Sequence, residues 1–181
     1  MADQEFELTA LLRIRTVTAK DAKDLQTYCF TDSSVEAIED ELKKDLERIK
    51  KDEVYRVVAE ASGHAVGNIR LERSKVDESL GEIGQLTVSP PFRKFDVAAR
   101  LVEVTEQIAQ ENKIKTLQIE LSKSENTIIT AYKKWGFDEL PVVTMQKTVE
   151  SPDQAAPDAE APRLEESSES SADEGEQQKL L

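Results

Sequence analysis

The sequence predicts an α/β fold in which helices pack against a mixed central sheet. Apolar residues alternate with polar ones in some segments and recur at helical spacing in others, and the two kinds of segment follow one another along the chain. The order that results is strand, helix, helix, three strands, helix, strand, helix, strand. At 181 residues the chain is long enough for one domain with a substantial core, plus a tail.

The N-terminal half of this pattern contains a strand, two helices and a hairpin. Its periodicity predicts a strand at residues 12–14, helices at 22–29 and 35–49, and strands at 54–60 and 65–73. Either Ser33 or Ser34 can cap the second helix. His64 lies in the polar turn between the last two strands, so we expect a surface residue there rather than a catalytic group.

The C-terminal half continues the alternation of strands and helices. It predicts a strand at 80–88, a helix at 95–111, a strand at 115–121, a helix at 126–135 and one or two closing strands within 137–148. In the first of these strands the alternation slips, because Ile83 is out of phase with Leu80 and Leu86. One extra residue near Gly84 would produce that slip, which indicates a β-bulge. Gly136 follows the last helix as its C-terminal cap.

Composition divides the chain into three parts. We expect a flexible N-terminus at 1–10, a folded domain at 11–148 and a disordered acidic tail at 149–181, because the tail is rich in Ser, Pro and Ala and has no apolar periodicity. Residues 150–181 hold ten of the 37 acidic side chains and two of the 24 basic ones, so much of the net charge of −13 belongs to the tail. The domain itself is only mildly acidic, and we expect no nucleic-acid partner.

Cysteine content and hydropathy indicate the compartment. Cys29 is the only cysteine, which excludes an internal disulfide and is typical of a reducing environment. The N-terminus has no basic and apolar leader, and no window approaches the roughly 18 apolar residues that a membrane span requires. We therefore expect a cytoplasmic protein without a membrane partner.

The most informative segment is Val88–Leu101, which reads VSPPFRKFDVAARL. It runs from the end of a strand through a short basic loop into an amphipathic helix. Unpaired N–H groups and the helix dipole make such a helix start an anion site, and Arg93 and Lys94 suit a phosphate-bearing ligand. Asp96 stands where a glycine would let the backbone approach a phosphate most closely.

Two further segments accompany this one in a fixed order. Residues 80–88 (LGEIGQLTV) carry the slipped strand, and residues 120–137 (ELSKSENTIITAYKKWGF) combine a strand end, an Asn, a Tyr and a closing Gly-Phe. Together the three segments resemble the GNAT superfamily of acetyl-CoA-dependent N-acetyltransferases over roughly residues 12–147, with the family's R-x-x-G-x-G/A signature read here as RKFDVA. The resemblance implies a mainly antiparallel sheet with about four helices, acetyl-CoA as cosubstrate and no metal.

The reaction that this resemblance implies needs a base for the amine, a donor for the oxyanion and an acid near the sulfur. Glu82 and Glu120 align with alternative bases of the family, and Tyr132 aligns with its acid. The structural alternatives are solvated or paired strand carboxylates and an ordinary helix aromatic. Because glutamate has a reference pKa of about 4.3, either carboxylate would need partial burial or a water relay to act as a base.

The same resemblance implies residues that hold acetyl-CoA. The main chain at Leu86 and Val88 would pair with the pantetheine arm like an added strand. The side chain of Asn126 would hydrogen-bond the same arm, or would only cap the last helix. The residues implied at the pyrophosphate are Arg93, Lys94, Phe95, Asp96, Val97 and Ala98.

Asp96 departs from the family pattern and keeps two functions open. If its carboxylate accepts an amide of the first helical turn, it would occupy the anion site and weaken binding by about 1 to 4 kcal/mol, roughly a fivefold to several-hundredfold loss of affinity. The first function is an active N-acetyltransferase whose partner is an amine substrate, either a small molecule or a protein. The alternative is a degenerate GNAT-like domain that binds a partner or an acyl-CoA without catalysis. We expect an open acceptor cleft and a monomer or homodimer.

Overall fold

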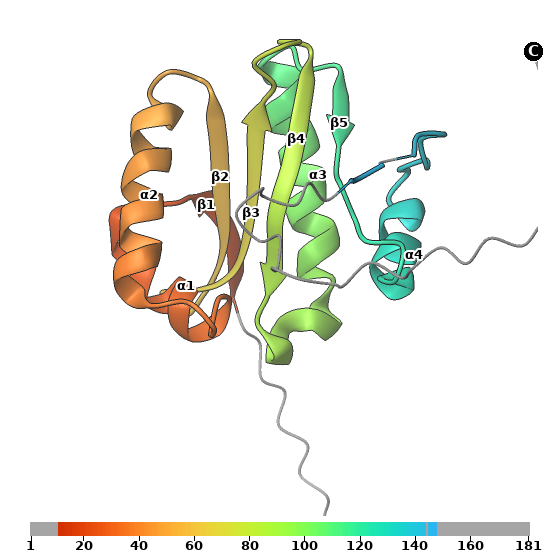
Figure 1. Cartoon of the computed structure of the whole chain (residues 1–181). Coiled ribbons are helices and arrows are strands. Elements are labelled where there is room, and N and C mark those ends of the chain that lie inside the picture. Colours follow the sequence, from red (N-terminus) through yellow and green to blue (C-terminus); the bar gives the residue numbers. More distant parts are fainter. Residues whose placement is uncertain (1–10, 144, 148–181) are drawn as a thin grey trace, which may run out of the picture. The chain divides into compact units, whose positions relative to one another are not determined.

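A computed structural model describes residues 11–143 and 145–147, and residues 11–139 form one compact unit. Its sheet has five strands in the order β1-β2-β3-β4-β5, of which the first four are antiparallel neighbours and β4 and β5 are parallel (Figure 1). The elements in chain order are β1 (Leu12–Thr16), a 3₁₀ turn (Ala19–Asp21), α1 (Ala22–Tyr28), α2 (Val35–Ile49), β2 (Val54–Ala61), β3 (His64–Arg73), β4 (Leu80–Val88), a 3₁₀ helix (Pro90–Phe95), α3 (Val97–Glu111), β5 (Thr116–Gln118) and α4 (Asn126–Lys134). The predicted α/β fold with a mixed, mainly antiparallel sheet is confirmed.

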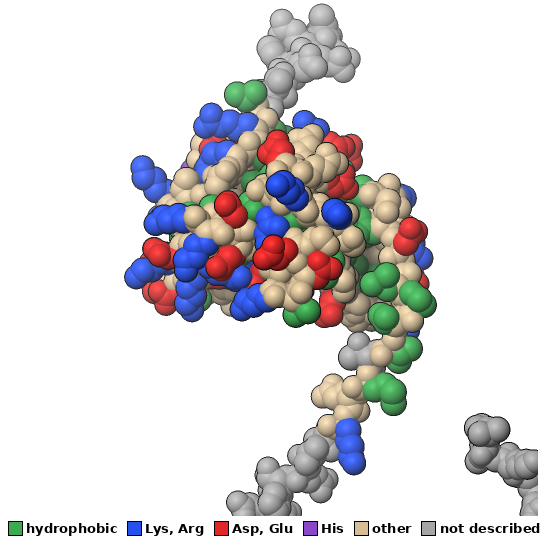
Figure 2. Space-filling model, turned by 90° about the horizontal axis from the view of Figure 1, so that it is seen from above, with side chains coloured by type: hydrophobic (Ala, Val, Ile, Leu, Met, Phe, Trp, Pro, Cys, Tyr) green, Lys and Arg blue, Asp and Glu red, His purple; other side chains and the backbone are tan. Residues whose placement is uncertain are grey.

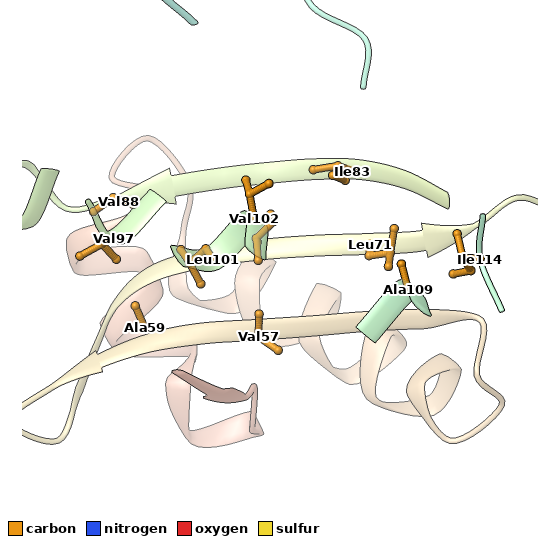
Figure 3. Packing of buried hydrophobic residues seen from close by; sticks show 11 residues of the cluster. Val57, Ala59, Leu71, Ile83, Val88, Val97, Leu101, Val102, Ala109 and Ile114 are labelled. Carbon is orange, nitrogen blue, oxygen red and sulfur yellow. The ribbon is translucent and has the colours of Figure 1, made fainter. Parts of the chain in front are cut away.

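The sheet separates two hydrophobic cores. Alternate residues of β2 point to opposite faces, so Val57 packs with α3 in one cluster and Val58 packs with α1 and α2 in the other. Figure 3 shows the first cluster, in which Leu101 and Val102 of α3 lie over β2, β3 and β4. The helices therefore cover both faces of the N-terminal part of the sheet.

The predicted bulge in β4 is present. Asn68 of β3 pairs with Thr87 and Arg70 pairs with Gly84, so β4 has one more residue than β3 between these two pairs. Within that stretch Gln85 has a φ of 53°, in the left-handed region that non-glycine residues rarely adopt. The slip in hydrophobic phase near Gly84 therefore located the bulge to within one residue.

The helix ends follow the local sequence. The side chain of Ser34 accepts a hydrogen bond from the N–H of Ala37 at 3.1 Å, so Ser34 rather than Ser33 caps α2. Gly136 follows α4 with a φ of 88°, as expected of a C-terminal glycine. The exposed His64 contacts Asp24 through Nδ1 at 3.2 Å, in agreement with its predicted surface position.

Three predicted boundaries are wrong. The helix expected from residue 95 begins at Val97, because two consecutive prolines without N–H groups favour a 3₁₀ turn at 90–95. The strand expected at 115–121 ends at Gln118, since β5 pairs only with the first residues of β4. The described residues 137–143 and 145–147 contain no strand, and Asp138, Glu139 and Pro141 are poor strand formers. The predicted tail lies outside the described residues.

Candidate active site

The sheet opens between β4 and β5. The two strands pair only at Leu80–Thr116, Gly81–Leu117 and Glu82–Gln118, and the bulge at Gln85 follows on β4. In Figure 1 the chain beyond β5 leads away from β4 towards α4. The second half of β4 therefore presents a main-chain edge that β5 does not cover.

The end of β4 turns its backbone toward this opening. The N–H of Ser89 donates to the carbonyl of Val66 at 2.8 Å, so this N–H faces β3. Because backbone groups alternate in direction along a strand, the N–H and C=O of Val88 face the opposite side. The carbonyl of Val88 accepts a hydrogen bond from Nε of Arg93 at 3.0 Å, which ties the loop before α3 to the end of the strand.

The conformation of Asp96 explains the glycine that the family signature carries at its position. Asp96 lies between the 3₁₀ helix and α3 with φ 55° and ψ 22°, a left-handed conformation that glycine adopts without strain and that Asp tolerates better than most residues. Its side chain makes no capping hydrogen bond, so of the two possibilities left open by the sequence the carboxylate does not occupy the first helical turn. The first-turn N–H groups of α3 have no partner within the helix, and the Asp96 carboxylate is exposed beside them.

The other residues implied at the pyrophosphate surround this helix start. Arg93, Lys94 and Phe95 are exposed, with Lys94 Nζ lying 5.2 Å from the centre of the Phe95 ring. Val97 is buried in the core and Ala98 is half-buried. The loop thus places two cationic side chains next to the N-terminus of a 15-residue helix.

The two candidate bases differ in how firmly they are held. Glu82 stands in the paired part of β4, in register with Glu72 on β3 and with Gln118 on β5. Glu120 lies two residues beyond the end of β5, outside the sheet. Both carboxylates are exposed, and within the described part of the chain neither makes an ion pair. Partial burial, one of the two conditions under which a glutamate could act as a base, is therefore absent at both positions.

Tyr132 is buried in α4. Its side chain is 4% exposed, and its ring meets Trp135 and Phe137 edge-on, with centroids 5.1 and 5.2 Å apart. Its hydroxyl has no hydrogen-bond partner among the described residues. Burial raises the pKa of Tyr132 to about 12, so the phenol keeps its proton at neutral pH. A buried hydroxyl without a partner is rare in folded proteins and needs an explanation.

Asn126 begins α4 and is exposed. The N-cap position belongs to Glu125, so the alternative in which Asn126 only caps the helix is wrong. Its main-chain carbonyl accepts from Thr130 Oγ1 at 2.7 Å. One open groove follows this helix and is lined by Asn126, Thr127, Thr130, Ala131, Lys134 and Trp135.

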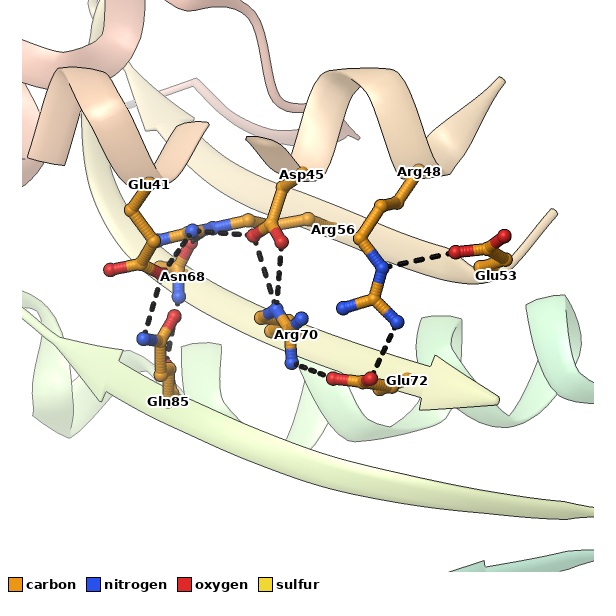
Figure 4. A network of polar contacts seen from close by, with 9 residues as sticks. All are labelled: Glu41, Asp45, Arg48, Glu53, Arg56, Asn68, Arg70, Glu72 and Gln85. Carbon is orange, nitrogen blue, oxygen red and sulfur yellow. Dashed lines mark hydrogen bonds and ion pairs between the residues drawn. The ribbon is translucent and has the colours of Figure 1, made fainter. Parts of the chain in front are cut away.

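The sequence reasoning missed a buried polar network beside the bulge. Arg56 of β2 is 1% exposed and binds Glu41 and Asp45 of α2 as well as Asn68 of β3 (Figure 4). The network continues to Gln85 in the bulge. The available signal was a set of charged residues at helical spacing on α2, together with an arginine among the valines of β2.

Comparison with known proteins settles the family. The sequence profile of the Acetyltransferase (GNAT) domain matches residues 18–149. The chain belongs to the GNAT acetyltransferase family. A comparison with curated protein sequences gives no match for this GNAT protein.

Solved structures share the GNAT fold of this protein at low sequence identity. An aminoglycoside N-acetyltransferase in complex with CoA has a TM-score of 0.67 and 15% identity, over 80% of this chain and 99% of that one. Glucosamine-6-phosphate N-acetyltransferase from Arabidopsis thaliana has a TM-score of 0.58 and 15% identity, over 77% and 99% of the two chains. The PaiA N-acetyltransferase from Thermoplasma acidophilum, in complex with coenzyme A, has a TM-score of 0.56 and 16% identity, over 68% of this chain and 87% of that one. These similarities establish the fold.

Surface and composition add three observations on this GNAT domain. On the face shown in Figure 2 acidic and basic side chains are interspersed, without a continuous basic stripe. Among residues 11–143 and 145–147 there is no cluster of three or more His, Cys, Asp or Glu side chains suited to a metal ion. None of the helices in the described residues has the length and apolar content to cross a membrane.

Proposed function

We propose that this protein is an N-acetyltransferase that moves an acetyl group from acetyl-CoA to an amine by direct attack within a ternary complex. The observation that carries the proposal is the opening of the sheet at the bulge, where β4 presents a main-chain edge beyond its three pairs with β5. An extended ligand can add to such an edge as a further strand does. The family of the chain, whose members include N-acetyltransferases solved with CoA, supports the choice of ligand.

The residues around the opening fit the parts of coenzyme A. The first-turn N–H groups of α3, with Arg93 and Lys94 nearby, suit the pyrophosphate. Backbone groups at Leu86 and Val88 suit the amides of the pantetheine arm, and the side chain of Asn126 supplies a further polar group. The chemistry that acetyl-CoA supplies when bound is an activated thioester carbonyl.

The chain's own residues would then manage the protons. We assign Glu82 as the base that removes a proton from the amine, directly or through a water, because the paired strands fix its position. Glu120 is the second candidate. The protonated hydroxyl of Tyr132 would donate a hydrogen bond at the departing sulfur, and such a role would give a partner to a hydroxyl that has none in the described residues.

The acceptor is an amine of a small molecule or of a protein. The aminoglycoside and glucosamine-6-phosphate enzymes that share the fold support an amine acceptor. The alternative, a domain that binds without catalysis, is favoured by one observation, the exposed carboxylate of Asp96 beside the helix start. Its charge would oppose the pyrophosphate, whereas Arg93 and Lys94 would offset it.

Amine-dependent release of the CoA thiol tests the proposal. The purified protein is given acetyl-CoA and a panel that includes aminoglycosides, polyamines and lysine-containing peptides, and free thiol is measured with and without each amine. Release that depends on an amine, and that Glu82→Gln together with Glu120→Gln abolishes, supports catalysis. Tight binding of acetyl-CoA without thiol release from any amine would contradict it and would support the binding domain.

A further inference from the structure

A closed ring of hydrogen bonds holds the bulge of β4. Asn68 Nδ2 donates to the main-chain oxygen of Gln85 at 2.8 Å, and Arg56 Nε donates to Asn68 Oδ1 at 2.8 Å. Arg56 Nη1 donates to Glu41 Oε1 at 2.7 Å, and Gln85 Nε2 donates to the same oxygen at 2.8 Å (Figure 4). The ring therefore binds both the main chain and the side chain of Gln85.

The direction of the ring is fixed by chemistry. A guanidinium can only donate, so the side-chain oxygen of Asn68 must face Arg56 and its NH₂ group must face the carbonyl of Gln85. Asn68 is fully buried, and Asp45 holds Arg56 from a second side at 2.9 Å. Because Arg56, Asn68 and Asp45 are buried, a change at Asn68 leaves polar groups there with few alternative partners, whereas Gln85 is exposed and Glu41 half-buried.

The bulge needs such support. Gln85 has a φ of 53°, which is unfavourable for a residue with a Cβ. The extra residue in β4 also takes part of the strand out of the regular ladder with β3. Strained backbone of this kind persists only where the surrounding structure imposes it, and the ring is the contact that does so here.

We propose that Asn68 is a positioning residue for acetyl transfer, because it holds Gln85 in the bulge and thereby keeps the edge of β4 open for the pantetheine arm. This inference rests on the proposed function. Without the Asn68 donor, β4 can return to regular pairing, and a shift of one residue would turn its backbone and side chains to the opposite sides. The main-chain groups at Leu86 and Val88 would then no longer meet the arm.

The substitution Asn68→Asp removes the amide donor and places a carboxyl group on the guanidinium that Glu41 and Asp45 also bind. Aspartate has the shape of asparagine and still accepts from Arg56, but it places an oxygen against the carbonyl of Gln85. The test compares the binding of CoA with that of adenosine 3′-phosphate 5′-diphosphate, which is the nucleotide half of CoA without the arm. We expect the Kd for CoA to rise about tenfold, in line with the loss of one buried hydrogen bond, and the Kd for the nucleotide half to stay unchanged.

A matched control separates positioning from general loss of stability. Thr105 is a buried residue of α3 whose hydroxyl donates to the carbonyl of Leu101 at 2.8 Å, away from the ring. Thr105→Val should lower the Tm without changing the ratio of the two Kd values. Gln85→Ala removes the hydrogen bond to Glu41 at an exposed position, where a substitution should not impair folding. It should raise the Kd for CoA but not the Kd for the nucleotide half, and by less than Asn68→Asp does.

The outcomes are distinguishable. A selective loss of CoA binding in Asn68→Asp, or in Gln85→Ala should Asn68→Asp not fold, supports the inference. Asn68 does not position the pantetheine arm if wild-type protein binds CoA and the ring variants bind it equally well. The same holds if the variants lose affinity for CoA and for its nucleotide half to the same degree. If wild-type protein binds neither ligand, the proposed function itself falls.

Discussion

The guanidinium of Arg93 donates through Nε to the main-chain carbonyl of Val88 at 3.0 Å, so the last residue of β4 and the loop before α3 form one linked unit. The link sets the direction in which the chain leaves the sheet. It also brings the left-handed Asp96 to the start of α3, at the end of the open strand edge. Under the proposed function, the phosphates of CoA would meet the charge and the backbone of Asp96 at this helix start.

Replacement of Asp96 separates these two effects. Asp96→Asn removes the charge but keeps a residue that tolerates positive φ, and Asp96→Gly also removes the strain. We expect Asp96→Asn to tighten CoA binding by roughly tenfold at low salt. Asp96→Gly should have the same effect and should also raise the free energy of unfolding by about 1 kcal/mol. Calorimetric titration at two salt concentrations measures the charge effect, which should shrink as salt rises. Equal affinities in all three proteins would exclude a role for this carboxylate.

Tyr132→Phe tests the assignment of the acid. The hydroxyl has no partner within residues 11–143 and 145–147, so its removal should leave the free energy of unfolding unchanged or raise it by up to about 1 kcal/mol. Turnover should nevertheless fall by roughly 10 to 100-fold if the hydroxyl assists the departing thiolate. Burial raises the pKa of Tyr132 to about 12, so deprotonation of this residue should not limit the rate below about pH 11. An unchanged kcat in Tyr132→Phe would show that Tyr132 serves only in packing.

The candidate bases are distinguished by paired amide variants. Both carboxylates are exposed, so Glu82→Gln and Glu120→Gln should each change the free energy of unfolding by less than about 0.5 kcal/mol. Because β3 and β5 flank Glu82, we expect Glu82→Gln to lower kcat by roughly 100-fold or more and Glu120→Gln to have a small effect. The opposite ranking in a single-turnover assay would make Glu120 the base.

Acid stability should depend on Glu72. A hydrogen bond from Arg48 holds the pKa of Glu72 below its ordinary value of 4.5, and a second bond from Arg70 adds to this against the opposing effect of burial. A carboxyl whose pKa is lower in the folded state adds stability above its unfolded pKa, and this is lost as the pH falls through the folded value. Glu72→Gln should therefore have a lower Tm than wild type at pH 7, and its Tm should fall less than that of wild type on acidification from about pH 5 downward. Glu39→Gln, at an exposed position of α2, serves as the control and should follow wild type at every pH.

Periodicity alone located most of the fold. It reports which face a residue points to, so the slip between Leu80 and Ile83 was enough to find the bulge beside Gly84. It does not report which distant strand will pair. For that reason the strand predicted at 115–121 is longer than β5, and Glu120 lies outside the sheet. The two prolines before Arg93 lack N–H groups and favour the 3₁₀ turn at 90–95, which apolar periodicity does not report.

The site was harder to predict than the fold. The resemblance named the residues around the opening, but the sequence left open whether the Asp96 carboxylate caps α3, and it gave no indication of the left-handed φ of Asp96. The ring that holds Gln85 joins residues from α2, β2, β3 and β4, which periodicity treats as separate elements. Arg56 was visible in the sequence as an arginine among valines, but only three-dimensional contact reveals what Arg56 and Asn68 support.

Hydrogen exchange with and without acetyl-CoA tests the central claim most directly, because it shows both whether the ligand binds and where. The account predicts slower amide exchange at 86–88, at 97–99 and along 126–132, with little change in α1 and β1. Protection at none of these segments, at saturating acetyl-CoA, would contradict a site in the opening between β4 and β5.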